Sequence, residues 1–229
     1  MNALLLSKTP LFRGATPEEV EAMLTCLGVE RRRYAKGELI LRTGGVVTAL
    51  GMVLSGKAII ESHDLWGGTT VLDSVTPGQI FAETYACTPG EPLMVDVTAA
   101  EATEVLFLPI GRVLRVCSHA CSHHAVLIRN LLALSAQKNL NLSRKIFHTS
   151  AKTIRGRLLS YLSYQAVRSG KYTFTIPFDR QQLADYLNVD RSAMSSELGK
   201  MQREGLLRTQ RNHFEPLGVV PGHSWGADG

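Results

Sequence analysis

Residues 178–198 have the sequence FDRQQLADYLNVDRSAMSSEL, which contains two short helical patterns joined by a tight connection. Asp179 and Gln182 have the spacing of a capping box and predict the start of the first helix. Asp190 closes the connection and is placed to cap the second helix, which runs to Glu204. Together these features predict a helix-turn-helix, the motif whose second helix enters the major groove of DNA.

The predicted second helix has two different faces. Met194, Leu198 and Met201 recur at helical spacing and predict the buried face. The opposite face carries small residues, which allow close approach to a surface, and arginines and hydroxyls, which suit base edges and phosphates. A generic helical hairpin with a polar outer face is the alternative interpretation. We expect base reading by Arg191, Ser192 and Ser196, and contacts with the DNA backbone by Arg180, Ser195, Lys200 and Arg208.

The charge distribution agrees with this assignment. The chain of 229 residues has a formal net charge of +5. Residues 1–140 carry 12 Lys and Arg against 13 Asp and Glu, whereas residues 141–229 carry 13 against 7, a net of +6. A basic C-terminal part favours a polyanion as partner. Residues 206–214 predict a β-hairpin, or wing, that adds basic side chains to this surface.

The middle of the chain has the pattern of a small β domain. Between Tyr34 and Pro109, short apolar runs alternate with glycine and proline turn signals at roughly ten-residue spacing. This pattern predicts an antiparallel sandwich or barrel. Ahead of it, Thr16 and Pro17 predict the start of a helix that Gly28 ends.

A long helix without proline or glycine is expected from His124 to Thr149. At about 26 residues it would be about 39 Å long, which favours a dimerisation or connecting helix over an ordinary core helix. Apolar residues at alternating spacings of three and four predict a coiled-coil seam with polar interruptions. We expect the dimer seam to contain Ile128, Leu131, Ser135 and Leu142, and Leu127, Leu134 and Leu140 to pack on the β domain.

Several protein classes are disfavoured by composition. The apolar runs are too short to span a bilayer, so no membrane partner is expected. No secretory signal is recognised at the N-terminus. Four cysteines in a chain of this length do not form a disulfide scaffold, so we expect a reduced, cytoplasmic setting.

The order of parts resembles the Crp/Fnr family of bacterial transcription regulators, the cyclic-AMP-receptor and fumarate/nitrate-regulator type, from about residue 11 to 217. The most specific stretch is 178–198, and Lys36-Gly37-Glu38, Leu54-Ser55-Gly56 and the run from Pro77 to Glu83 agree with it. The resemblance implies an α+β fold. Its parts would be a double-stranded β-helix of the cyclic-nucleotide-binding type over 1–122, a dimerisation helix over 123–150 and a winged helix-turn-helix over 151–229.

The function implied by this resemblance is that of a homodimeric, DNA-binding regulator that couples a small-molecule or redox signal to promoter binding. Its partners would be double-stranded DNA, a second copy of the chain, RNA polymerase and an unknown effector. We expect no enzyme activity, no catalytic or metal-ligating residues and no resident cofactor.

The resemblance also places the effector pocket. Cyclic-nucleotide members carry a Gly-Glu pair and, about ten residues on, an arginine that neutralises the cyclic phosphate. Here the first pair is Ala82-Glu83 and the second position is Leu93-Met94. Burying a phosphate without its arginine costs about 3–5 kcal/mol, so we expect no response to cyclic AMP. The expected pocket residues are Glu83, Leu93 and Met94, with Leu142 and Ser143 at the positions that would meet a purine.

Two alternatives stay open, and two further classes are disfavoured. The patch Cys117–His124 suggests a metal-, haem- or thiol-based sensor through Cys117, Cys121 and nearby histidines, although it lacks paired Cys-x-x-Cys spacing. An iron–sulfur sensor is disfavoured because only Cys26 lies near the N-terminus. A cupin-type enzyme is disfavoured because His63 is the single histidine of the β region. A ligand-binding regulatory subunit without a DNA role is the remaining class.

Overall fold

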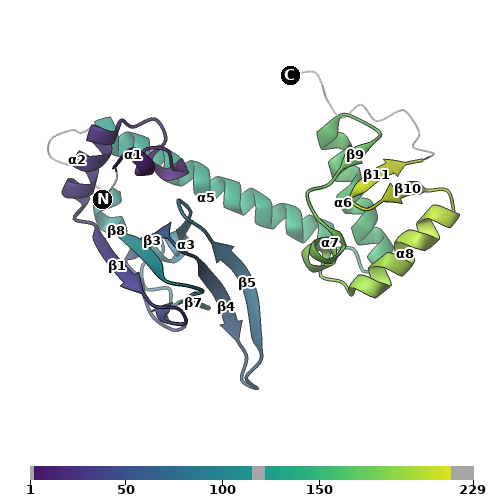
Figure 1. Ribbon diagram of the computed structural model, residues 1–229, viewed down its shortest axis with the longest axis horizontal. Helices are drawn as coiled ribbons and strands as arrows, with labels where there is room; N and C mark the ends of the chain where they lie inside the picture. The colour runs from purple at the N-terminus through teal and green to yellow at the C-terminus, as the bar shows by residue number, and fades with distance from the viewer. Residues whose placement is uncertain (1–2, 115–121, 218–229) are drawn as a thin grey trace. The chain divides into compact units, whose positions relative to one another are not determined.

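The computed structural model describes residues 3–114 and 122–217, and side chains from residue 124 in the second range (Figure 1). The chain divides into two compact units, residues 1–137 and 138–229. Helix α5 (Ser122–Thr149) contributes residues to both units. No helix within the described ranges is long and apolar enough to cross a membrane.

The first unit contains two four-stranded antiparallel sheets, as the alternation of apolar runs and turns predicts. One sheet has the order β1-β8-β3-β6 and the other β2-β7-β4-β5. Side chains from both sheets form one apolar cluster, which includes Val53 and Phe107 from the first and Val75 and Val97 from the second. The strands are β1 (Glu30–Tyr34), β2 (Leu39–Leu41), β3 (Ala49–Ser55), β4 (Ala58–His63), β5 (Thr69–Val75), β6 (Ile80–Phe81), β7 (Asp96–Ala99) and β8 (Thr103–Pro109).

A glycine is required where β3 meets β6. Gly51 pairs with Phe81 across the two strands. A Cβ atom at Gly51 would lie 2.2 Å from the Phe81 ring. The aromatic ring therefore packs directly on the backbone of β3 and belongs to the same cluster.

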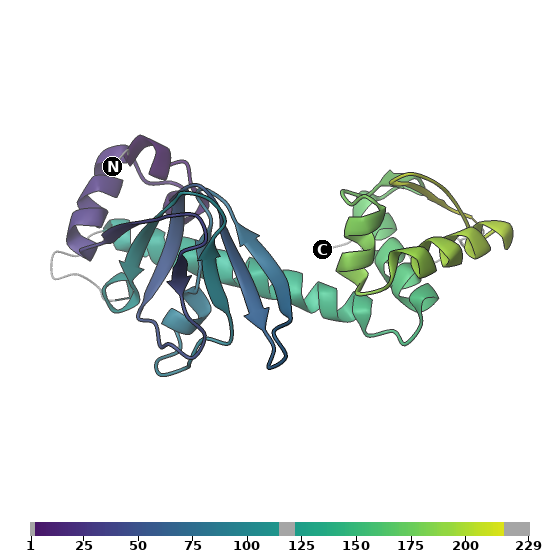
Figure 2. The ribbon, with the colours of Figure 1, turned by 60° about the horizontal axis from the view of Figure 1, so that its bottom comes forward.

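Short helices and the first half of α5 pack against the sheets (Figure 2). They are α1 (Ala3–Leu6), the 3-10 helix η1 (Pro10–Phe12), α2 (Pro17–Leu27), α3 (Glu83–Ala86) and α4 (Ile110–Val113). Helix α2 begins with the predicted cap, since the Thr16 side chain accepts from the Glu19 amide and Gly28 ends it in the left-handed conformation. A second apolar cluster joins these helices to β3, β8 and Leu127 of α5.

The β4–β5 hairpin ends in an apolar tip. Asp64 accepts hydrogen bonds from the amides of Trp66 and Gly68, both at 2.8 Å, and so fixes the turn. Leu65 and Trp66 are 96% and 90% exposed. Figure 1 shows the tip as the loop that joins the lower ends of β4 and β5.

The second unit contains the end of α5, three further helices and a small sheet of order β10-β11-β9. Its elements are α6 (Ile154–Ser169), β9 (Phe174–Thr175), α7 (Arg180–Leu187), α8 (Arg191–Arg203), β10 (Leu207–Gln210) and β11 (His213–Pro216). The predicted helix-turn-helix corresponds to α7 and α8, and the predicted wing to β10 and β11. Helix α6 was not among the sequence predictions, and its Leu158, Tyr161 and Leu162 form part of the core of this unit.

The structure corrects the predicted dimer seam of α5 at one residue. Leu131, predicted in the dimer seam, is 4% exposed because it packs in the core of its own chain. Leu140, predicted to pack on the β domain, is exposed. Ile128 and Ser135 are half-buried. The exposed large apolar residues of α5 are Leu132, Leu140, Leu142, Ile146 and Phe147.

The Cys117–Cys121 part of the histidine-rich patch lies outside the described residues. Within the described ranges, no group of three or more His, Cys, Asp and Glu side chains is arranged to hold a metal ion.

Candidate nucleic-acid interface

Local hydrogen bonds fix the start of both helices of the motif. Asp179 accepts from the Gln182 amide and the Gln182 side chain accepts from the Asp179 amide, which is the predicted capping box. Asn188 ends α7 in the left-handed conformation. Asp190 then caps α8 by accepting from the Ala193 amide at 2.8 Å. The two predicted caps are confirmed.

Two arginines of α6 hold the motif in place. Arg157 donates to the carbonyl oxygens of Leu187 and Asn188 at 3.1 and 2.8 Å, so it binds the turn between the two helices. Arg155 donates to Glu197 of α8 at 2.5 Å and to Glu204 beyond it at 2.7 and 2.9 Å. These contacts raise the pKa of Arg155 and lower that of both carboxyls. Helix α6 is thus bonded to the turn between α7 and α8, to the middle of α8 and to the residue that follows α8.

Helix α8 has the two faces that its sequence predicts. Met194, Leu198 and Met201 are buried in the core of the unit. The residues predicted to face DNA at its start are exposed, namely Arg191, Ser192, Ser195, Ser196 and, one turn further, Lys200.

The polar groups on this exposed face differ in the hydrogen bonds and ion pairs that they form within the protein. The Ser192 hydroxyl donates to Asp190 at 2.5 Å, which together with the Ala193 amide lowers the pKa of Asp190. This serine therefore keeps its acceptor capacity for a base or phosphate. Lys200 lies 3.6 Å from Glu197, an ion pair at the surface. Arg191 forms no ion pair with another described residue.

Arg180, which is predicted to contact phosphate, also has partners within the second unit. Its guanidinium lies over the ring of Phe214, 5.1 Å from the centroid, and donates to the Thr209 hydroxyl at 2.8 Å. Burial lowers the pKa of this side chain. Arg180 therefore ties the start of α7 to the wing.

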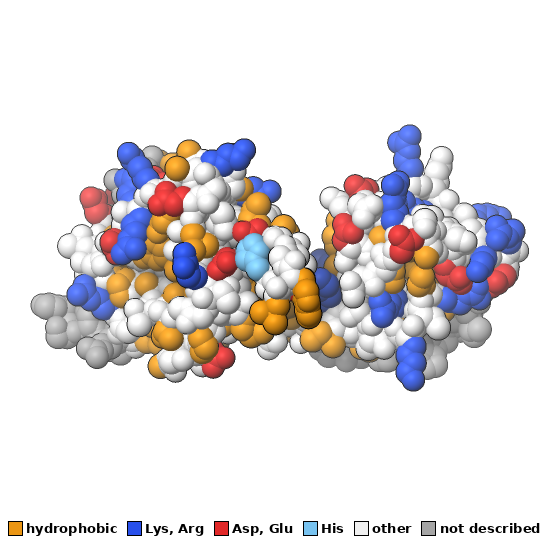
Figure 3. Space-filling view, turned by 90° about the horizontal axis from the view of Figure 1, so that it is seen from below, with side chains coloured by type: hydrophobic (Ala, Val, Ile, Leu, Met, Phe, Trp, Pro, Cys, Tyr) orange, Lys and Arg blue, Asp and Glu red, His pale blue; other side chains and the backbone are white. Residues whose placement is uncertain are grey.

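The wing supplies cations of its own. Arg208 on β10 is largely exposed and lies 3.7 Å from Glu215 on the paired strand. Arg211, which is not among the predicted DNA contacts, lies in the hairpin turn with a φ of 52°. An open hollow of about 720 Å³ lies between the start of α7, Arg191 of α8 and Arg211 of the wing. Figure 3 shows further Lys and Arg side chains over the visible face of this unit.

The predicted effector residues lie in both units. Glu83 begins α3 and is buried, and Ala82 before it has a φ of 58°, in the left-handed region that favours glycine. Leu93 is 3% exposed, whereas Met94 beside it is exposed. Leu142 and Ser143 are exposed on the part of α5 that belongs to the second unit.

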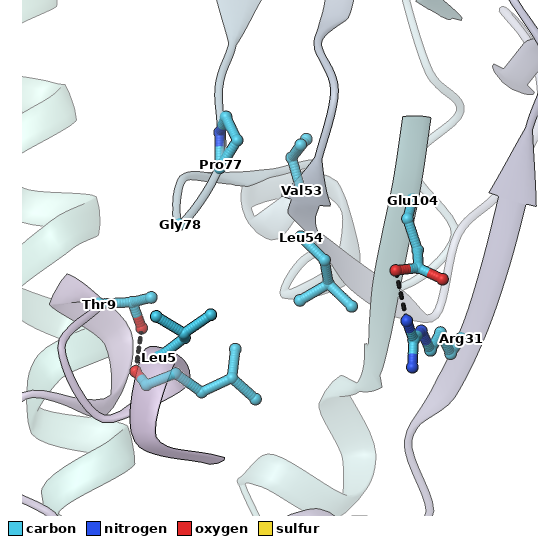
Figure 4. Close-up of a pocket in the computed structure, with 9 residues that line it drawn as sticks. Leu5, Thr9, Arg31, Val53, Leu54, Pro77, Gly78 and Glu104 are labelled. Carbon is cyan, nitrogen blue, oxygen red and sulfur yellow. Dashed lines mark hydrogen bonds and ion pairs between the residues drawn. The ribbon is translucent and has the colours of Figure 1, made fainter. Parts of the chain in front are cut away.

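A separate pocket of about 370 Å³ lies on the first unit, between α1 and strands β1, β3 and β8 (Figure 4). Leu5, Leu54 and Pro77 supply apolar surface. Glu104 on its wall accepts from Arg31 at 2.5 Å and from Arg33 at 2.8 Å, which lowers its pKa to about 2. The Arg31–Glu104 pair is visible in the figure, and the pocket offers mainly apolar contact beside it.

Comparisons with known proteins agree with this architecture. A family model described as a cyclic nucleotide-binding domain matches residues 31–120, and one described as a Crp-like helix-turn-helix domain matches residues 156–216. The chain is 28% identical over 206 residues to a protein called cyclic AMP receptor protein from Thermus thermophilus, with 87% of this chain and 88% of that protein covered.

Solved structures give the same result. The crystal structure of the Thermus thermophilus catabolite activator protein matches with a TM-score of 0.51 and 26% identity over 91% of this chain and 93% of that one. The c-di-GMP responsive regulator CLP of Xanthomonas campestris matches with a TM-score of 0.52 over 89% of this chain and 100% of its own. At 19% identity, that second match supports the fold alone.

A cyclic-nucleotide-binding type of β domain followed by a winged helix-turn-helix defines a class of DNA-binding transcription regulators. The two family models and the relative that spans most of the chain place this protein in it. The chain belongs to the Crp/Fnr family.

Proposed function

We propose that this protein is a homodimeric transcription regulator that reads DNA with the start of α8. The observation that carries the proposal is the exposed row of Arg191, Ser192, Ser195 and Ser196, on a helix whose other face is buried. Residues near the start of the second helix are those that reach base edges in this docking mode. The regulator would act on promoters in contact with RNA polymerase, as the family resemblance implies.

Arg191 is the proposed guanine reader. An arginine can donate two hydrogen bonds to O6 and N7 of guanine, and loss of such a pair costs about 1–3 kcal/mol. Ser196 discriminates less, because a hydroxyl both donates and accepts, and Ser192 offers only an acceptor while its hydroxyl donates to Asp190. Ser195, Lys200 and Arg208 are proposed to contact phosphates, and we add Arg211 because it lies at the exposed wing turn beside the hollow.

Binding selection from random DNA tests this proposal. Wild type is expected to recover a near-palindrome whose half-site centres lie about 34–36 Å apart. Arg191→Ala should lose information at one base pair per half-site. Arg203→Ala is the matched control, since it removes the same charge from the other end of α8 and should weaken all sequences alike. Equal motifs from wild type and Arg191→Ala would overturn the assignment.

We propose that the dimer forms through the exposed apolar residues of α5, with Leu132, Leu140 and Ile146 as its main contacts. On a helical wheel at 100° per residue, Leu132 and Ile146 lie 40° apart and Leu140 lies 80° from Leu132 on the other side. Leu131 points 100° away from Leu132, toward the core. When two copies of α5 pack side by side, these apolar side chains can bury each other. In a single copy they are exposed to water.

We propose further that the effector is not cyclic AMP. In the resemblance, Leu93 stands where the phosphate needs an arginine, and this leucine is buried. Cyclic AMP is the competing candidate, because the relative from Thermus thermophilus is called a cyclic AMP receptor protein. Titration calorimetry should detect no micromolar binding of cyclic AMP by wild type, and such binding would refute the proposal. Leu93→Arg should gain binding, whereas Met94→Arg, which adds the same charge at the exposed neighbour, should not.

A further inference from the structure

His148 lies at the C-terminal end of α5 inside a cluster of aromatic rings, all within the second unit. Its side chain is 1% exposed. The imidazole contacts the rings of Phe147, Tyr161, Tyr164 and Tyr186, with centroids 5.2–5.9 Å apart. These tyrosines belong to α6 and α7, so one side chain connects the long helix to both supporting helices of the DNA-binding module.

The polar atoms of the imidazole are unequally satisfied. Nδ1 forms a hydrogen bond of 2.9 Å with the Tyr186 hydroxyl on α7. Nε2 is buried and has no hydrogen-bond partner among the described residues. A neutral imidazole leaves one ring nitrogen unbonded here, whereas an imidazolium would bury both a charge and an unpaired N–H donor.

The groups that face His148 do not favour its charged form. The charged neighbour is Arg144 on α5, whose guanidinium lies over the Tyr164 ring at 5.6 Å. The titratable neighbours are Tyr161 and Tyr164 on α6 and Tyr186 on α7, and burial raises the pKa of Tyr161 to about 12. No described carboxylate forms an ion pair with His148. Burial, followed by repulsion from Arg144, accordingly lowers the pKa of His148.

We infer that His148 is a positioning residue that holds the helix-turn-helix on the end of α5 only while its imidazole is neutral, so that mild acid releases this contact and weakens binding to paired half-sites. The inference rests on the proposed function, because the contact matters for DNA only if α5 joins two modules. With the ordinary histidine pKa of about 6.5 in the released state, the ratio of released to closed modules rises about tenfold between pH 7.5 and 5.5.

The direction of the effect is diagnostic. Protonation of exposed histidines makes the protein more positive and by itself strengthens binding to DNA. Release of the module has the opposite effect, because the second half-site is then bound at a lower effective concentration. A single half-site does not depend on the contact.

The test measures binding of full-length wild type and variants to the selected operator and to one half-site, at pH 7.5 and 5.5 and constant salt. Wild type should lose affinity for the operator, up to about tenfold, and keep or gain affinity for the half-site. His148→Gln, which stays neutral and can still bond to Tyr186, should keep its operator affinity in acid. His63→Gln, an exposed histidine on β4, is the matched control and should behave like wild type.

The near-ultraviolet circular dichroism of the tyrosines gives a reading that needs no DNA. Their signal should fall in wild type between pH 7.5 and 5.5 and hold in His148→Gln. If His148→Gln fails to fold, His148→Phe replaces it, since a phenyl ring fills the same aromatic site without titrating. Absence of specific binding at pH 7.5 would refute the proposed function. Unchanged operator affinity in acid, or equal losses in wild type and His148→Gln, would overturn the inference about His148 alone.

Discussion

Two adjacent leucines of α5 should respond in opposite ways to substitution. Leu131 is 4% exposed and packs in the core of the first unit, whereas Leu132 is 68% exposed. Replacing a buried leucine by alanine removes its transfer free energy and leaves a cavity, at a cost of about 2–5 kcal/mol. Leu131→Ala should therefore lower the free energy of unfolding by about 3 kcal/mol and leave the dimer mass unchanged.

Leu132→Asp should instead weaken the dimer and leave the stability of the monomer nearly unchanged. Surface substitutions change the stability of a monomer by about 0.5 kcal/mol or less. If Leu132 packs against a second copy, however, each protomer loses about 1.5–3 kcal/mol of apolar burial. The dimer dissociation constant should then rise by at least about 100-fold, since each 1.4 kcal/mol is a factor of about ten.

Light scattering over a concentration series gives the mass, and urea denaturation gives the stability. The urea denaturation of both variants is carried out at protein concentrations below those at which they dimerise, because dimerisation itself raises apparent stability. With an m-value of about 1–3 kcal/mol per molar urea, Leu131→Ala should shift the midpoint by about 1–3 M. A Leu131→Ala protein that is monomeric and as stable as wild type would show that the two faces of α5 are exchanged.

Three further predictions concern stability and the support of the DNA-binding motif. Ala82→Gly should raise the free energy of unfolding by about 0.5–1 kcal/mol, because the steric cost of the left-handed conformation for alanine exceeds the backbone entropy that glycine loses on folding. A lower melting temperature would contradict this. Glu104 owes its low pKa to Arg31 and Arg33, so the stability it adds is complete above its ordinary pKa of 4.5 and is lost as pH falls toward 2. Glu104→Gln should reduce that loss of stability in acid, and acid-unfolding curves identical to those of wild type would exclude the effect. Arg157→Met should cost about 2 kcal/mol and speed hydrogen exchange at the turn between α7 and α8, whereas unchanged protection there would show that the turn does not depend on it.

The helix-turn-helix could be predicted closely because its signals are local. The capping box at Asp179, the cap at Asp190 and the apolar spacing of α8 all act within a few residues, and each is observed. The β domain was predictable as a class from its turn spacing, although the pairing of strands far apart in sequence, such as β1 with β8, was not.

The errors concern residues whose partners are distant in the sequence. The prediction for Arg180 left out its contacts with Thr209 and Phe214, because these residues lie about thirty positions away in the sequence. The choice between Leu131 and Leu132 required knowing which face of α5 the β domain covers. Helix α6 did have a local signal, since Thr153 caps it, Gly170 ends it and apolar residues recur between them.

The hairpin tip gives the protein a natural spectroscopic reporter. Trp66 is one of two tryptophans in the chain, and Trp225 lies outside the described residues. In a Trp225→Phe protein all indole emission would come from a ring that is 90% in water, held by a turn that Asp64 has already ordered. Such an indole emits at long wavelength and is open to collisional quenchers, so a blue shift on adding DNA, effector or polymerase would show that the tip has become covered, without any attached dye.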